Sequence, residues 1–173
     1  MELGSGVEKI YFDMDGVLAD FDRGVRDFCG IEPGKQGDRN DAADTSLWER
    51  VKKVDHFYDR LELVPGAKEL FDMVYAAYGE RCEILTGIPR PHRGLLNAAE
   101  DKVKWVRRLL SEDVVVNTVF RAEKVKFCHG SGCILIDDYE KNIAEWEASG
   151  GTGVLFTSVP DVIGVLKDKG IQI

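Results

Sequence analysis

The amino-acid sequence predicts an α/β fold: a doubly wound parallel sheet with helices on both faces and a small helical cap inserted after the first strand. Five short runs of apolar, β-forming residues recur along the chain, with amphipathic helical patterns between them. Strands that are apolar on both faces are typical of a parallel sheet, and their alternation with helices favours a Rossmann-like arrangement. This alternation stops between residues 21 and 64, which predicts the insertion.

The predicted elements alternate along the chain. The strands are Ile10–Phe12, Cys82–Leu85, Val114–Val119, Ile134–Ile136 and Val154–Phe156. Helical faces with apolar residues three and four positions apart lie within 67–75, 103–110 and 162–166. The second of these faces is predicted to bury Val103, Val106, Leu109 and Leu110.

The insertion has helical patterns of its own. The pair Ser46 and Glu49 matches a capping box, which predicts that a helix begins there. The segment is too short for an independent domain, and it leaves and rejoins the chain between the first two strands. We therefore predict an α/β core formed by residues 1–20 and 65–173 and a small helical cap formed by residues 21–64.

Composition and charge limit the class of protein. The chain has 173 residues, 44% of them hydrophobic, which is enough for one core with an insertion. The net charge of −8 argues against a nucleic acid polymer as partner, because binding to phosphate backbones requires clustered Lys and Arg. No run approaches the roughly 20 apolar residues of a membrane span. The four cysteines are scattered, which fits reduced thiols. We expect a cytoplasmic protein with no membrane partner.

Polar residues follow most of the predicted strands. Because ligands bind beyond the carboxyl ends of strands in open parallel sheets, these residues should meet at one rim. Several carboxylates there would repel one another unless a divalent cation lay among them, and oxygen ligands suit Mg²⁺. The residues are Asp13, Asp15, Thr86, Lys124, Asp137 and Asp138. We therefore predict a Mg²⁺ site that is shared with a phosphate group.

The same residues belong to an ordered set of motifs. The segments DMDGVLADF, FYDRLELVPGA, EDKVKWV, FRAEK, LIDD and VLFTS occur in this order. Together with Thr86 they resemble the haloacid dehalogenase superfamily of Mg²⁺-dependent phosphatases, and more closely the 5′(3′)-deoxyribonucleotidases of cytosolic and mitochondrial type. The resemblance covers nearly the whole chain. It implies a phosphoric monoester hydrolase that acts on (deoxy)nucleoside monophosphates.

The resemblance also implies a role for each residue of the core site. Asp13 would be the nucleophile that attacks phosphorus, and Asp15 would serve as general acid and base. Thr86 would donate its hydroxyl group to a phosphate oxygen. Lys102 matches a phosphate-contacting position and Lys124 a second, supporting one.

A metal site is implied by the same resemblance. The Mg²⁺ ligands would be the Asp13 side chain, the Asp15 backbone carbonyl and Asp138, with Asp137 close behind them. A second carboxylate two residues after the nucleophile also favours phosphate esters over carbon–halogen bonds, since the dehalogenating branch lacks it.

The cap would recognise the leaving group. Phe21, Phe57 and Tyr58 are candidates for stacking on a base, since aromatic faces bind any base. Gly87 and Arg90, in the loop after the second strand, are further substrate-binding candidates. The family usually has Ser and Pro directly after its motif threonine, and the glycine found here puts the base and sugar preference in doubt. Because capped members often pair, a homodimer is left open.

Other functions stay open at this point. A phosphatase of another small metabolite, such as a sugar phosphate, would use the same core residues. A non-catalytic phosphate-binding protein would use the same cleft without turnover. A receiver domain is disfavoured, because its phosphorylated aspartate follows the third strand and this chain has none there. The sequence does not distinguish the base, ribose from deoxyribose, or a 5′ from a 3′ phosphate.

Overall fold

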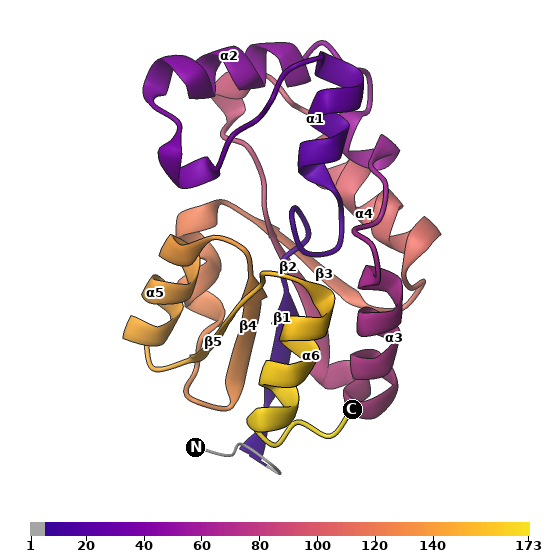
Figure 1. The fold of residues 1–173 in the computed structure, drawn as a ribbon, viewed down its shortest axis with the longest axis vertical. Helices are drawn as coiled ribbons and strands as arrows, with labels where there is room; N and C mark the ends of the chain where they lie inside the picture. Colours follow the sequence, from indigo (N-terminus) through magenta and orange to yellow (C-terminus); the bar gives the residue numbers. More distant parts are fainter. Residues whose placement is uncertain (1–5) are drawn as a thin grey trace.

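The sheet of the computed structural model has five parallel strands in the order β3-β2-β1-β4-β5 (Figure 1). The strands are β1 (Lys9–Phe12), β2 (Cys82–Gly87), β3 (Val115–Val119), β4 (Cys133–Asp137) and β5 (Thr152–Leu155). The α/β class and the five predicted strands are therefore confirmed. The structure describes residues 6–173, so residues 1–5 of the predicted core lie outside the described residues.

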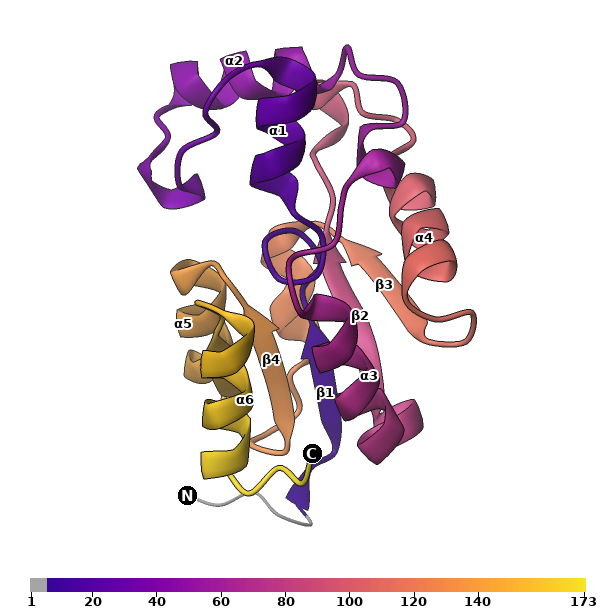
Figure 2. The same cartoon turned by 45° about the vertical axis from the view of Figure 1, so that its right-hand side comes forward.

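Helices cover both faces of the sheet (Figure 2). Helices α3 (Ala67–Tyr78) and α6 (Val159–Asp168) pack on the face that carries Phe12, and α5 (Glu140–Ala148) packs on the face that carries Tyr11. Neighbouring residues of β1 belong to different clusters because successive side chains of a strand point to opposite faces. No helix among residues 6–173 is long and apolar enough to cross a membrane.

Helix α4 (Ala98–Leu109) buries a face that matches the predicted one only in part, since Val106 and Leu110 are buried as expected. Val103 is only partly buried, whereas Trp105 and the charged residues Asp101 and Lys102 are buried. A hydrophobic pattern cannot reveal a face whose buried members include charged side chains, because such residues are assigned to solvent. The predicted face was therefore right for Val106 and Leu110 and wrong for Val103.

Helix α2 (Asp41–Val51) begins earlier than predicted. Its N-cap is Asn40, whose side chain accepts the N–H of Ala43 at 2.8 Å. Asparagine is among the strongest N-caps, so the helix starts here and Ser46 lies inside it. The predicted capping box of Ser46 and Glu49 was wrong.

The inserted segment lies beyond the carboxyl ends of the strands, where Figures 1 and 2 show α1 (Phe21–Cys29) and α2. The segments that enter and leave it pair with each other. The Asp20 N–H donates to the Glu62 carbonyl and the Val64 N–H donates to the Leu18 carbonyl, both at 2.8 Å. The division into a core and a cap with limits at residues 21 and 64 stays a prediction.

Short 3₁₀ helices complete the connections. They are η2 (Gln36–Asp38), η3 (Phe57–Arg60), η4 (Gly79–Arg81), η5 (Pro91–Arg93) and η6 (Arg121–Phe127). Two of them carry candidate site residues: η3, within the cap segment, carries Phe57 and Tyr58, and η6, after β3, carries Lys124.

Candidate active site

The loop after β1 turns sharply where the central strand ends. The Asp13 N–H still donates to the Ile136 carbonyl of β4 at 2.9 Å. The carbonyl of Met14 then accepts the N–H groups of residues 17–19. Gly16 has φ of +82°, a left-handed conformation that glycine adopts without steric cost. The turn therefore places Asp13 and Asp15 at the carboxyl end of the sheet.

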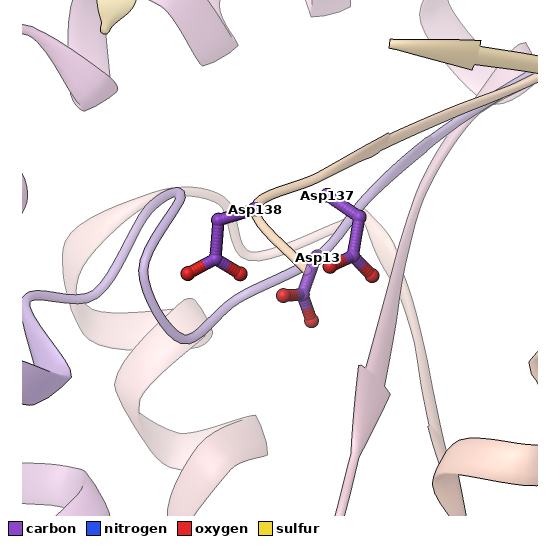
Figure 3. Close-up of side chains that lie close together, drawn as sticks. All are labelled: Asp13, Asp137 and Asp138. Carbon is purple, nitrogen blue, oxygen red and sulfur yellow. The ribbon is translucent and has the colours of Figure 1, made fainter. Parts of the chain in front are cut away.

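Three carboxylates converge at this end, as Figure 3 shows for Asp13, Asp137 and Asp138. One oxygen from each lies within 4.8 Å of the others. Burial and the charge of Asp137 raise the pKa of Asp13 to about 7. Partial burial and the charges of Asp13 and Asp137 raise the pKa of Asp138 to about 8. A cluster so rich in negative charge, with oxygen donors, fits a hard divalent cation.

Lys124, on η6, lies between two of these carboxylates. Its Nζ donates to Asp13 Oδ1 at 2.9 Å and to Asp137 Oδ2 at 2.8 Å, and its side chain is 3% exposed. Burial lowers the pKa of an ammonium, but the charges of Asp13 and Asp137 outweigh this effect and raise the pKa of Lys124. Because an ammonium has three N–H groups, one is left for a ligand.

Asp137 is occupied by protein donors on both oxygens. Its Oδ1 accepts the Tyr139 N–H at 2.9 Å, and its Oδ2 accepts both Lys124 and Asn142 Nδ2, the latter at 3.0 Å. The oxygens open to a metal ion are therefore on Asp13 and Asp138, with Asp137 adding charge behind them. Asn142 was missed in the sequence because α5, which carries it, has few apolar residues and was not predicted. The one feature of the sequence that could have identified Asn142 was its position shortly after the LIDD motif.

A second group of polar side chains surrounds Lys102, which is fully buried. Its Nζ donates to Asp15 Oδ2 at 2.8 Å and to Thr86 Oγ1 at 3.0 Å. The third N–H goes to the Gly87 carbonyl at 2.6 Å, and the ring of Tyr58 lies 4.4 Å from Nζ. All three N–H groups of Lys102 are therefore engaged by the protein, unlike those of Lys124.

The other carboxylate oxygen of Asp15 has a different environment. Asp15 Oδ1 is buried and has no hydrogen-bond partner among residues 6–173. An unpaired buried oxygen costs about 1–3 kcal/mol, so native proteins keep such atoms where a ligand completes them. The hydroxyl of Thr86 accepts from Lys102 and can still donate its own hydrogen. The site therefore presents an acceptor and a donor beside the carboxylate cluster.

The predicted base-stacking residues form one aromatic cluster in the cap. The ring of Phe21 stacks on Tyr58 with an interplanar angle of 29° and meets Phe57 edge-on at 75°. Trp48 adjoins Phe21 at 5.9 Å between ring centroids. Phe57 and Tyr58 are each 2% exposed, whereas Phe21 is only partly buried. Of the three predicted residues, Phe21 keeps the largest share of its surface open to a ligand.

The other two substrate-binding candidates, Gly87 and Arg90, lie at the end of β2 and in the loop that follows it. The Gly87 carbonyl binds Lys102, and a Cβ at Gly87 would lie 3.7 Å from the backbone of Arg121, at ordinary contact distance. Arg90 is exposed, with its guanidinium 4.5 Å from the ring centroid of Phe120. Roles for Gly87 and Arg90 in binding substrate stay predictions.

Gly16 offers a test of the carboxylate cluster that does not change a carboxylate. A Cβ on Gly16 would lie 2.1 Å from Asp138 Oδ2, whereas nothing lies within 4 Å of a Cβ on Gly30, which has φ of +67°. We expect Gly16→Ala and Gly30→Ala each to lower the free energy of unfolding by about 1–2 kcal/mol through backbone strain. Gly16→Ala alone should weaken Mg²⁺ binding, by about tenfold, because Asp138 must move.

Calorimetric titration of each variant with Mg²⁺ after EDTA treatment, together with urea unfolding, measures both effects. Equal Mg²⁺ affinity in Gly16→Ala and Gly30→Ala would show that Asp138 does not hold the ion.

A comparison with protein families gives a match over most of the chain. The model of the family described as "5′ nucleotidase, deoxy (Pyrimidine), cytosolic type C protein" matches residues 7–162. A search of curated proteins gives no match to this chain.

Solved structures with similar folds are hydrolases. A haloacid dehalogenase (HAD) family hydrolase from Deinococcus radiodurans R1, with bound phosphate and sodium, has 13% identity and a TM-score of 0.62, covering 95% of this chain and 97% of that one. A HAD hydrolase from Entamoeba histolytica has 15% identity and a TM-score of 0.52, with coverages of 95% and 90%. A phosphonoacetaldehyde hydrolase-like protein from Oleispira antarctica has 17% identity and a TM-score of 0.51, with coverages of 86% and 72%.

At these identities the structural likeness shows the fold, and the family match shows the relationship. The match at residues 7–162 includes every residue of the two lysine groups and the carboxylate cluster. The chain belongs to the cytosolic type C family of 5′ (deoxy)nucleotidases, and its fold is similar to that of the HAD hydrolases named above.

Proposed function

We propose that the protein is a Mg²⁺-dependent phosphomonoesterase that uses Asp13 as its nucleophile and releases phosphate from (deoxy)nucleoside monophosphates. The observation that carries this proposal is the contrast between two aspartates two residues apart. Asp13 lies among carboxylates with Lys124 on one oxygen. Asp15 is held through one oxygen by Lys102, and its other oxygen is buried and free.

The first step forms a covalent bond between Asp13 and phosphorus. Lys124 holds Asp13 Oδ1, so Oδ2 is the oxygen that attacks. As the bond from Oδ2 to phosphorus forms, the bond from phosphorus to the ester oxygen breaks, and the nucleoside leaves. Water then attacks the phosphorus of the aspartyl-phosphate, which releases phosphate and restores the Asp13 carboxylate.

Asp15 moves the protons of both steps. Lys102 engages Oδ2, so the transferred proton is carried on Oδ1. Protonated Oδ1 donates to the leaving alkoxide, and the resulting carboxylate then accepts a proton from the attacking water. After the second step Asp15 is protonated again, so the cycle closes without another base.

In this proposal Lys124 contacts the phosphoryl group and Lys102 supports it, which reverses the roles that the resemblance implies. Lys124 has one N–H free beside the nucleophile, so it contacts the transferred phosphoryl group directly. Lys102 has none free, so it holds Asp15 and Thr86 in place. The Thr86 hydroxyl donates to a phosphate oxygen, and these groups together stabilise the charge that develops in the transition state.

The residues also fit a Mg²⁺ ion. Asp13 and Asp138 have oxygens open to it, the Asp15 carbonyl lies in the same loop, and Asp137 adds charge behind them. When bound, the ion supplies charge neutralisation between the carboxylates and the phosphate.

The cap cluster favours a nucleotide as substrate. Phe21 is only partly buried and would stack on the base, while the rings of Phe57 and Tyr58 pack against it. The name of the matched family, which specifies deoxy and pyrimidine nucleotides, points the same way. Within the cytosolic family we also propose that this protein acts in the cytoplasm.

Released inorganic phosphate tests the proposal. We would incubate the protein with 5′ and 3′ nucleoside and deoxynucleoside monophosphates and with sugar phosphates, each with Mg²⁺ or EDTA. We expect Mg²⁺-dependent release from deoxynucleoside monophosphates, most strongly with pyrimidine bases. Release from sugar phosphates alone would overturn the substrate, and undiminished release in EDTA would overturn the metal requirement.

A further inference from the structure

A buried carboxylate lies directly beside Lys102 on helix α4. The side chain of Asp101 is 4% exposed. Its partner is His56, whose Nδ1 lies 2.9 Å from Oδ1 and 3.2 Å from Oδ2 of Asp101. The hydrogen bond with Asp101, its charge and that of Asp55 raise the pKa of His56. The imidazole of His56 therefore supplies the hydrogen-bond partner of this buried carboxylate.

His56 adopts an unusual backbone conformation to make this contact. Its φ is +50°, and it is the one non-glycine residue with positive φ among residues 6–173. Such a conformation is strained for a residue with a Cβ and persists where surrounding contacts impose it. The strain lies at the start of η3, immediately before Phe57 and Tyr58. The contact between His56 and Asp101 therefore lies at the point where η3 begins.

Further contacts join α4 to the same segment. Trp105 Nε1 donates to the Leu61 carbonyl at 2.8 Å, one helical turn beyond Asp101. Arg108 binds Asp59 at the next turn. Helix α4 is therefore attached to residues 56–61 along one side.

Lys102 extends from this attached helix to the active site. Its ammonium lies between Asp15 and Thr86, and the ring of Tyr58, on η3, covers it at 4.4 Å. A shift of α4 relative to η3 would therefore change two contacts of the ammonium at once. The position of Lys102 therefore depends on the contacts between α4 and residues 56–61.

We infer that His56 and Asp101 form a positioning pair that sets the ammonium of Lys102 against Asp15 and Thr86. Neither residue touches the reacting groups, and the pair acts through Lys102. The consequence for turnover depends on the function proposed above, whereas the consequence for the placement of Lys102 does not.

Chemical labelling of lysines measures that placement without any turnover. We would compare reductive methylation rates of single lysines, read by mass spectrometry, in the wild type, Asp101→Ala and Asp55→Ala. Asp55 is also close to His56, at 3.7 Å, but its side chain is 90% exposed, so it is a matched control. Lys104 reports intrinsic reactivity on the same helix. Lys124, buried against Asp13, reports the integrity of the fold.

We expect Asp101→Ala to increase the labelling rate of Lys102 about tenfold or more, because local opening of α4 becomes easier when its contact with His56 is lost. The rates of Lys104 and Lys124 should stay unchanged, and Asp55→Ala should match the wild type. Unchanged protection of Lys102 in Asp101→Ala would overturn the inference. A joint rise of Lys102 and Lys124 would do the same, since it would indicate general loss of structure.

A second variant breaks the pair from the other side. His56→Gly removes the imidazole, and glycine adopts the positive φ without strain, so the backbone of η3 is spared. It should expose Lys102 to the same extent as Asp101→Ala.

In both variants kcat should fall about tenfold with little change in KM, since Lys102 holds a group that acts in the transition state. A rise of KM at constant kcat would overturn the inference. If the wild type hydrolyses no phosphate ester, the proposed function fails, and the labelling result still decides the role of the pair.

Discussion

Asp13→Asn should abolish phosphate release, with a loss of about 10⁴-fold or more, while the protein stays folded. The amide is nearly the same size as the carboxylate but is not a nucleophile, so no covalent intermediate can form. The substitution also removes a negative charge from a buried cluster in which the pKa of Asp13 is raised to about 7. We therefore expect the melting temperature to stay the same or rise.

This combination separates a nucleophile from a structural aspartate. The measurements are phosphate release under saturating substrate and thermal unfolding followed by circular dichroism. Asp72→Asn is the control, because Asp72 is an exposed aspartate on α3 paired with Lys68. It should change neither property. Retention of more than about 1% of wild-type turnover by Asp13→Asn would rule out Asp13 as the nucleophile.

Lys124→Met should weaken both activity and stability. Methionine matches the length of the lysine stem but leaves Asp13 and Asp137 without their shared cation. Breaking a buried ion pair by removing one partner costs about 3–5 kcal/mol of unfolding free energy. Loss of a charge stabiliser at the transferred phosphoryl group should lower kcat by about 10²–10³-fold. Urea unfolding at pH 7 and steady-state kinetics measure the two effects.

Lys126→Met is the matched control two residues away. The Lys126 side chain is 71% exposed and pairs with Glu123 on the surface, where such pairs contribute about 0–1 kcal/mol. It should leave kcat unchanged. Equal effects of the two substitutions would show that the bridge from Lys124 to the aspartates has no special role.

The stability cost of Lys124→Met should also depend on pH. Asp13 has a pKa of about 7 in the folded protein against an ordinary value of 3.8, so the folded state binds its proton more tightly. The contribution of this group to stability therefore falls as pH rises from about 4 to about 7. Without Lys124 the pKa of Asp13 should rise further, so the fall should continue to higher pH. The stability difference from wild type should accordingly shrink when unfolding is repeated at pH 5, and a constant difference would contradict this account.

Much of the fold could be predicted from local patterns. The five strands were visible because each is a run of apolar β-formers, and their alternation with helices implied a parallel sheet. Helix α5 was not visible, because Ile143 and Trp146 are its only buried apolar residues. The start of α2 was misplaced because the prediction rested on Ser46, whereas the side chain of Asn40 caps the helix.

For the candidate site, the residues that directly follow the strands could be predicted from the sequence. Asp13, Asp15, Thr86 and the LIDD aspartates follow strands, and a parallel sheet brings strand ends together. Lys102 was identified by the resemblance and not by any local pattern, and its complete burial was not predicted. His56 and Asp101 carried no signal of any kind, because each has an ordinary neighbourhood in the sequence.

The sequence by itself determined the α/β class, the rim on which the polar residues gather and the family to which the chain belongs. Only the tertiary structure decided which partners the two lysines bind. Lys102 meets Asp15 across 87 residues and Lys124 meets Asp13 across 111. Periodicity reports which side of an element faces the core, but it contains no information about which partner a buried charge finds there. That choice is made by packing, since a buried ammonium or carboxylate is tolerated only where the fold brings opposite charges and hydrogen-bond partners to it.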